Sequence, residues 1–120
     1  MDAMIKEQTT NVQLNVRCLP PDVRSSFHRW CTARGASMEH AVRQIIEAIT
    51  SGELTPIITD DNAVDTAGAV ALNIRCLHYN LRRHFKSWCV LRGVSMEHAV
   101  RQIIEAVVAG RIVPRVAPDR

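Results

Sequence analysis

Side chains that can form paired hydrogen bonds recur on alternate residues at two places in the chain, 58 residues apart. Asn and Gln amides can bond adenine through two hydrogen bonds, and an Arg guanidinium can bond guanine in the same way. Ala71 stands where the first set has Gln13, and an alanine methyl can contact only the methyl group of thymine. The residues that we expect to contact DNA base edges are Gln13, Asn15, Arg17, Ala71, Asn73 and Arg75.

The sequence around these residues is itself repeated. Residues 14–56 align with residues 72–114 without a gap, and 25 of the 43 pairs are identical. A unit of about 43 residues is too small to enclose a core of its own. Two copies are also too few for a solenoid, which needs roughly three or more. We therefore expect one folded domain in which each copy completes the other.

Charge is distributed unevenly over the divisions that the repeat suggests. The formal net charge is +3, but the first copy carries +1, the join −3 and the second copy +5. A basic surface on the folded copies is typical of proteins that bind polyanions, although other basic proteins show it too. The expected divisions are an N-terminal arm (1–10), a first unit (11–53), a linker (54–68), a second unit (69–111) and a C-terminal tail (112–120).

Each copy shows the pattern of one strand followed by two helices. Residues 12–19 and 70–77 alternate apolar and polar side chains, which predicts half-buried strands. A helical apolar stripe follows in each copy and ends at Gly35 or Gly93. Ser37 and Ser95 then have the position of N-caps for a second helix. A lone strand needs a partner, so we expect the two strands to pair antiparallel about a pseudo-two-fold axis.

The N-termini of the second helices are candidate phosphate sites, because free amides and the helix dipole attract anions. Glu39 and Glu97 oppose this, since they place a carboxylate at the same end. Basic residues of the first helices could add further contacts, or could simply form a solvated face. The expected phosphate contacts are Ser37, Met38, Ser95, Met96, Arg24, Arg82, Arg83 and Lys86.

The order of these motifs resembles the ribbon-helix-helix family, the superfamily of the Arc and MetJ repressors. Residues 13–17 have the Gln-x-Asn-x-Arg outward pattern of the Arc strand that reads DNA. Residues 35–39 and 43–46, reading Gly-Ala-Ser-Met-Glu and Arg-Gln-Ile-Ile, are similar to the FitA-type antitoxin branch. Known members are usually homodimers of single units, whereas this chain is a covalent fusion, as in some conjugation-associated members. It also lacks the long C-terminal tail of most antitoxins.

The resemblance implies a fold that is mostly α, with a two-stranded antiparallel β-ribbon in a tandem (βαα)2 pseudo-dimer. The function we expect is sequence-specific binding of double-stranded DNA, most simply as a transcriptional repressor of its own operon. Further copies of the chain could bind adjacent sites. Two alternatives are an antitoxin that binds a protein toxin and an accessory protein at a plasmid transfer origin or partition site.

Other chemistries have weaker support in the sequence. No nucleophile–base set or phosphate-binding glycine loop occurs, so we expect no enzyme activity and no cofactor. A metal site is not expected either, because Cys18 and Cys31 fall on core-facing stripes. We expect His40 and His98 to be structural, with pH sensing as the alternative, and Trp30 and Trp88 to pack in the core. No apolar run reaches the ~20 residues of a membrane span, which favours a cytoplasmic, nucleoid-associated protein.

Overall fold

The computed structural model describes residues 11–59 and 68–118. The expected N-terminal arm, most of the linker and the last two residues lie outside the described residues. Within them the chain contains two strands and four helices, two helices after each strand. In chain order these are β1 (Asn11–Leu19), α2 (Pro21–Thr32), α3 (Met38–Thr50), β2 (Val70–His78), α4 (Tyr79–Leu91) and α5 (Met96–Val108).

The expected fold class is wrong in its sheet. We expected a mostly α protein whose sheet is a two-stranded antiparallel ribbon, as in a tandem ribbon-helix-helix pseudo-dimer. The sheet is instead three-stranded and antiparallel, and β1 and β2 are its strands within the described residues. A two-stranded ribbon leaves both of its edges unpaired, and a third strand satisfies the donors and acceptors of one edge. Period-2 alternation marks only two segments of the sequence, so it could not predict a third strand.

β1 and β2 pair in a register that is symmetric about one residue pair. Asn15 lies opposite Asn73, and the flanking pairs are Leu14 with Ile74 and Val16 with Leu72. The register shifts by one residue on either side, where Val12 pairs with Leu77 and Leu19 with Val70. These two outer pairs are equivalent under the 58-residue offset of the repeat. Each strand therefore contains one β-bulge, and the two bulges are related by the pseudo-two-fold axis.

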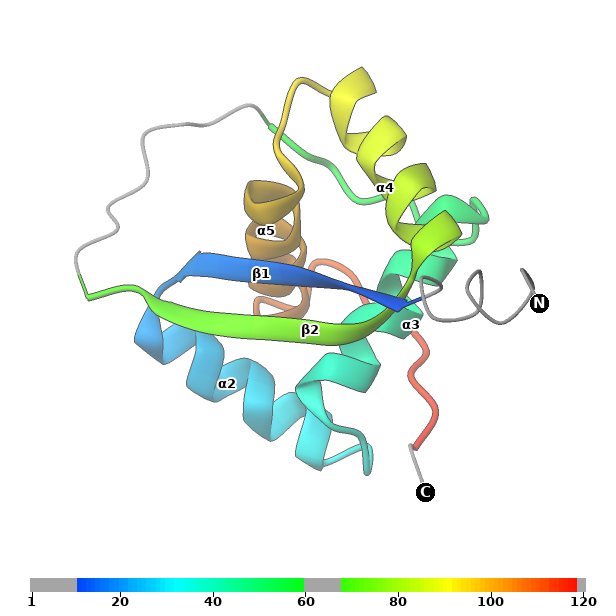
Figure 1. Ribbon diagram of the computed structural model, residues 1–120. Coiled ribbons are helices and arrows are strands. Elements are labelled where there is room, and N and C mark those ends of the chain that lie inside the picture. Colours follow the sequence, from blue (N-terminus) through cyan, green and yellow to red (C-terminus); the bar gives the residue numbers. More distant parts are fainter. Residues whose placement is uncertain (1–10, 60–67, 119–120) are drawn as a thin grey trace.

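The helices form a layer behind the two strands (Figure 1). α3 and α5 lie directly behind the strands, and α2 and α4 lie toward opposite ends of the strands. The packing crosses between the repeats, because α5 contacts β1 while α3 contacts β2, and α2 contacts α5 while α4 contacts α3. One core results, in which Phe27, Phe85 and most apolar residues of α3 and α5 are buried. Neither repeat encloses a core alone.

Local sequence explains where the helices begin and end. The hydroxyl of Ser37 accepts a hydrogen bond from the amide of His40, so the predicted N-cap is confirmed, and Ser95 caps α5 in the same way. Gly35 has a φ of 71°, in the left-handed region that favours glycine at a helix end. α4 lacks the proline that opens α2, and the ring of His78 accepts from the amide of Asn80 instead. Each repeat thus turns sharply enough to return its second helix to the strands.

Candidate nucleic-acid interface

The six residues expected to contact bases all lie on one exposed face of β1 and β2. The residues that alternate with them, such as Leu14, Val16, Leu72 and Ile74, are at most 6% exposed and face the helices. The two strands therefore have one buried face and one solvent-exposed face, as the alternation in the sequence indicates. The side chains brought together on the exposed face are Gln13, Asn15, Arg17, Ala71, Asn73 and Arg75.

The two bulges fix how these side chains are arranged. In β1, Arg17 and Cys18 together lie opposite Ala71, and in β2, residues 75 and 76 together lie opposite Gln13. A bulge leaves one amide outside the ladder and re-aims the side chain beside it. Both arginines of the candidate site are the first residue of a bulge. The bulges, as well as the regular pleat of the strands, therefore determine where the side chains of Arg17 and Arg75 lie.

Carboxylates from the second helices bind both bulges. The amide of Arg17 donates to a carboxylate oxygen of Glu97, and the amide of Arg75 donates to Glu39. Each glutamate lies in the first turn of its helix, where negative charge is favoured by the helix dipole. This role was not predicted from the sequence, from which we expected the glutamates only to compete with a phosphate. A polar residue repeated unchanged beside an N-cap was the available signal.

The same glutamates also form ion pairs with the arginine side chains. Arg17 Nε is 3.6 Å from Glu97 Oε2, and Arg75 Nη2 is 3.5 Å from Glu39 Oε1. The arginine side chains are 73% and 68% exposed. Exposed pairs of this length contribute little to stability, at most about 1 kcal/mol. Each guanidinium is therefore oriented by its glutamate but remains available to another partner.

The residues expected to contact phosphate form a less uniform group. The hydroxyls of Ser37 and Ser95 are used in the caps, so the first-turn amides, including those of Met38 and Met96, remain the candidates at these ends. Arg24 is engaged, since its Nε donates to the backbone oxygen of Ala71 at 3.2 Å. This contact attaches α2 to Ala71, the residue of β2 that lies opposite the bulge of β1. Arg24 therefore has a structural role that its place in the sequence did not predict.

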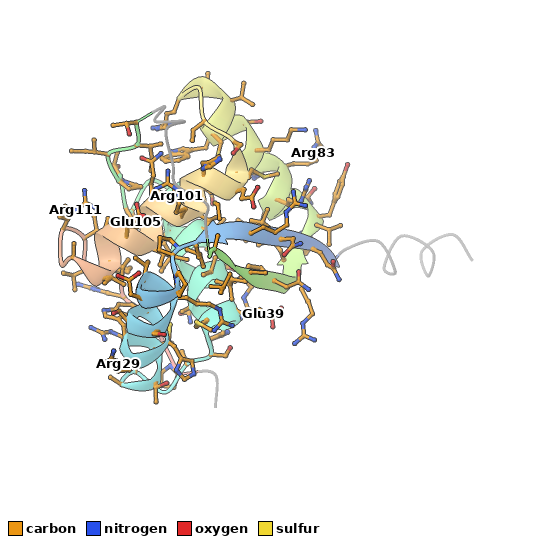
Figure 2. All side chains as sticks on the ribbon, turned by 90° about the vertical axis from the view of Figure 1, so that its left-hand side faces the viewer. Arg29, Glu39, Arg83, Arg101, Glu105 and Arg111 are labelled. Atoms are coloured by element: carbon orange, nitrogen blue, oxygen red, sulfur yellow. The ribbon has the colours of Figure 1, made fainter. Side chains whose placement is uncertain are left out.

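The basic residues of α4 differ from their counterparts in α2. Arg82 is equivalent to Arg24, but its Nε is buried without a hydrogen-bond partner among the described residues. Arg83 has its guanidinium carbon 5.8 Å from the ring centre of Tyr79, and Lys86 is exposed. In Figure 2, Arg83 and Glu39 lie on the side of the molecule that carries the strands. α4 therefore carries two exposed basic residues, Arg83 and Lys86, where α2 has Ser25 and His28.

Two glutamines hold the segments that follow the second helices. Gln102 accepts from the amide of Thr59 at 2.9 Å and donates to its carbonyl oxygen at 2.6 Å. Gln44 binds both backbone groups of Ala117 in the same way, at 2.9 and 3.0 Å. Thr59 and Ala117 are also 58 residues apart, so the structural repeat extends beyond the aligned sequence. Each segment crosses to the other repeat, so the described part of the linker is bonded to α5 at Thr59.

Cys18, Cys31 and Cys89 have the environment of packed thiols. Cys31 and Cys89 are buried, and desolvation raises the pKa of each thiol to about 12. Burial and the charge of Glu97 also raise the pKa of Cys18. Across residues 11–59 and 68–118, no three His, Cys, Asp or Glu side chains are grouped so that they could hold a metal ion.

The histidines and tryptophans of the repeats have defined neighbours. His40 contacts Arg43 through its ring, and His98 accepts from Arg101 Nε at 3.5 Å, so both rings have hydrogen-bond partners. Trp30 stacks on Phe27 with 5.8 Å between ring centres, and Trp88 stacks on Phe85 in the same way. Both tryptophans pack against the core, as predicted.

None of the helices in the described part of the chain is long and apolar enough to span a bilayer. Comparison with family models, curated proteins and solved structures gave no match to this chain.

Proposed function

We propose that this protein binds double-stranded DNA in a sequence-specific manner, as a transcriptional repressor that regulates its own operon. The observation that carries the proposal is the exposed face of β1 and β2, where amides and guanidiniums stand side by side over a buried apolar face. The exposed face of paired strands can enter the major groove of B-DNA, where base edges present distinct donor and acceptor patterns. A strand face that only contacts water has no need of the amide and guanidinium groups that match base edges.

The positions of the arginines support this role. The side chains of Arg17 and Arg75 are 73% and 68% exposed. The glutamates that orient them, Glu97 and Glu39, are only 25% and 21% exposed. Bidentate contact of Arg with guanine contributes about 1–3 kcal/mol of discrimination against other bases. Because the ion pairs are long and exposed, exchanging them for a base contact loses little free energy. Arg17 and Arg75 are thus oriented for recognition without being committed to it.

Phosphate contacts are assigned to the first turns of α3 and α5 and to α4. Amides at a helix N-terminus bind phosphate through hydrogen bonds and the helix dipole. Glu39 and Glu97 place their carboxylates toward the bulges, in contact with the strand amides. Arg83 adds charge on the side that carries the strands, and Lys86 adds exposed charge on α4, both on one half only. We therefore propose stronger phosphate binding by the second repeat than by the first.

The antitoxin alternative is less favoured by the described contacts. It requires a free segment to wrap around a toxin, and the linker and the two ends of the chain are the candidates. Among the described residues these candidates are the segments after α3 and α5. Gln102 and Gln44 instead hold Thr59 and Ala117 against the chain's own helices. The accessory role at a plasmid transfer origin or partition site uses the same DNA chemistry as repression. Mapping the bound sites on the source replicon distinguishes the two.

Binding to DNA selected from a random pool, compared with a scrambled duplex at rising salt, tests the proposal. Phosphate contacts weaken with salt for every sequence, whereas base contacts preserve a difference between the two duplexes. We expect the selected duplex to bind at least about 1,000-fold more tightly, within the range of specific DNA-binding proteins. Affinities that fall together and never separate would remove sequence specificity. Binding to neither duplex would reject the proposal altogether.

A further inference from the structure

A small cavity lies beside α5, on the side of the protein away from the paired strands. Its volume is about 190 Å³, and it lies between α5, the segment around Thr59 and the turn after α5. In Figure 2, Glu105 and Arg111 lie on the opposite side of the molecule from Arg83 and Glu39. The lining residues are Ile57, Thr59, Arg101, Gln102, Glu105 and Arg111.

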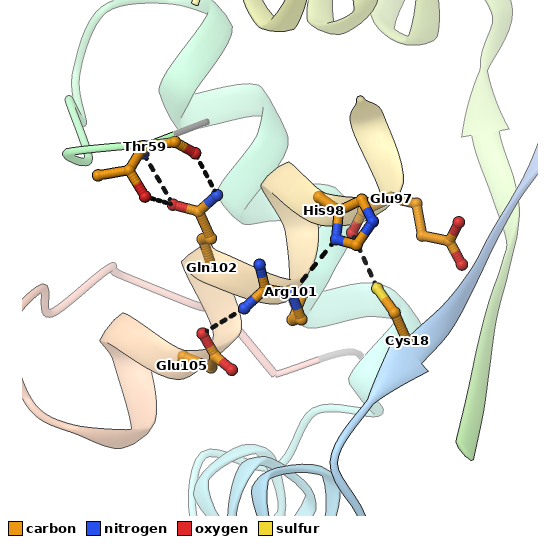
Figure 3. Close-up of polar contacts among 7 residues, drawn as sticks. All are labelled: Cys18, Thr59, Glu97, His98, Arg101, Gln102 and Glu105. Atoms are coloured by element: carbon orange, nitrogen blue, oxygen red, sulfur yellow. Dashed lines mark hydrogen bonds and ion pairs between the residues drawn. The ribbon is translucent and has the colours of Figure 1, made fainter. Parts of the chain in front are cut away.

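Arg101 is the charged side chain that is buried within the described residues, with only 5% of its surface exposed. Its Nη1 bonds Glu105 Oε1 at 2.9 Å, and its Nε donates to the ring of His98. Its Nη2 is buried and has no hydrogen-bond partner in the described chain. In Figure 3, the remaining guanidinium nitrogen lies on the side of Gln102 and Thr59. A buried polar group is rarely left without a hydrogen-bond partner, so an acceptor is expected beside Nη2.

The charges around the cavity indicate what that acceptor is. Arg101 and Arg111 bring two positive charges, and Glu105 brings one negative charge that Arg101 already binds. We propose that this cavity binds a small oxyanion, a phosphate or a carboxylate, between Arg101 Nη2 and the Arg111 guanidinium. Guanidinium groups match the geometry of both ligands. The ligand would accept a hydrogen bond from Arg101 Nη2 and form an ion pair with Arg111 across the cavity.

The pseudo-symmetric position in the first repeat provides a natural control. The 58-residue offset places Glu53 at the position of Arg111 and Arg115 at the position of Ile57. A cavity there is lined by Glu47 and Glu53 against the single base Arg115. Its net charge is thus negative where the cavity at Arg101 is positive. The same fold therefore presents one anion site and one counterpart that repels anions.

The test uses the full chain without DNA, so its outcome is independent of the proposed function. Thermal unfolding and amide NMR spectra are recorded with inorganic phosphate, with succinate and with sodium chloride at equal ionic strength. A ligand that binds only the folded state raises the melting temperature in a saturable manner. We expect phosphate or succinate to do so where chloride does not, with shifts of the Thr59 and Gln102 amides. The more effective of the two identifies the ligand class.

Two single substitutions complete the experiment at exposed positions that should not disturb the core. Arg111→Glu copies the first repeat onto the second and should weaken anion binding at least 10-fold. Glu53→Arg is the matched control, which should leave binding at the Thr59 and Gln102 amides unchanged. Circular dichroism verifies that both variants fold. Equal responses to all three salts, or binding by Arg111→Glu as tight as by the unmodified chain, would overturn the proposal.

Discussion

Asn15 and Asn73 lie directly opposite each other on β1 and β2, and each is the counterpart of the other in the repeat. The pseudo-two-fold axis therefore passes between them, at the centre of the exposed face. We predict that Asn15→Ala and Asn73→Ala alter the selected DNA sequence at its centre. Arg17→Ala and Arg75→Ala should instead alter positions on opposite sides. Selection from random DNA with each variant measures this, and an unchanged sequence for all four would exclude the strands as the reading surface.

We predict that Glu97 stabilises the bulge of β1 at Arg17 and also weakens the affinity for DNA of any sequence. Glu97→Ala leaves the amide of Arg17 without its acceptor, which should lower the free energy of unfolding by about 1–3 kcal/mol. Glu97→Gln keeps an acceptor oxygen and should lose less stability. Both variants remove a negative charge beside the strands, so binding to scrambled DNA at low salt should tighten. Urea unfolding and anisotropy titrations measure these effects, and equal stability losses would contradict the proposed role of the carboxylate.

Ala71 is predicted to make the two halves of the DNA site unequal. It occupies the position of Gln13 in the other strand and cannot form paired hydrogen bonds. Ala71→Gln should make the selected site more nearly palindromic and gain about 1–3 kcal/mol at one base pair. Site selection followed by titration of both sites checks this. The reverse change, Gln13→Ala, is the control and should make the first half resemble the second.

The clamp of Gln102 on Thr59 is predicted to order the segment after α3. Gln102→Ala removes both hydrogen bonds to the Thr59 backbone and should lower stability by about 1–2 kcal/mol. The Thr59 amide should then exchange faster with solvent, as NMR can measure. Gln44→Ala frees Ala117 instead and should leave the exchange of Thr59 unchanged. Faster exchange of Thr59 in both variants would contradict two separate clamps.

The thiols of Cys31 and Cys89 predict a loss of stability in alkaline solution. Burial raises each pKa from 9.0 to about 12, so the folded state keeps protons that the unfolded chain releases. Stability from this source is complete below about pH 9 and decreases as the pH rises toward 12, by about 1.4 kcal/mol per thiol and pH unit. Urea unfolding across this range measures the slope. The Cys31→Ala/Cys89→Ala variant should show a smaller slope.

The elements repeated in the sequence were predictable, because their signals are local. Alternation located β1 and β2 to within a residue or two, and the caps of α3 and α5 followed from Ser37 and Ser95. The number of strands was not predictable, because the alternation that marks strands is confined to the two repeats. The fold class that we expected from that alternation and from the family resemblance was consequently wrong in its sheet.

The candidate site was predictable in its exposed residues but not in their attachments. Periodicity alone places Asn15 and Asn73 on the wet face, whereas the bulges depend on how two distant strands meet. Glu97 lies 80 residues from Arg17, and Arg24 lies 47 residues from Ala71. The hydrogen bonds between Gln102 and the backbone of Thr59 likewise join residues whose identities give no sign that they meet. Contacts of this kind follow from tertiary packing, which no local pattern encodes.

The crossed packing of the two repeats also has a consequence for synthesis on the ribosome. The first repeat emerges while α5, which covers β1, has not been made, and its apolar strand face has no partner. At about 5–20 residues per second, the second repeat follows within several seconds. The nascent first half is therefore exposed to wrong pairing during that interval, and a pause in translation between the repeats should increase aggregation.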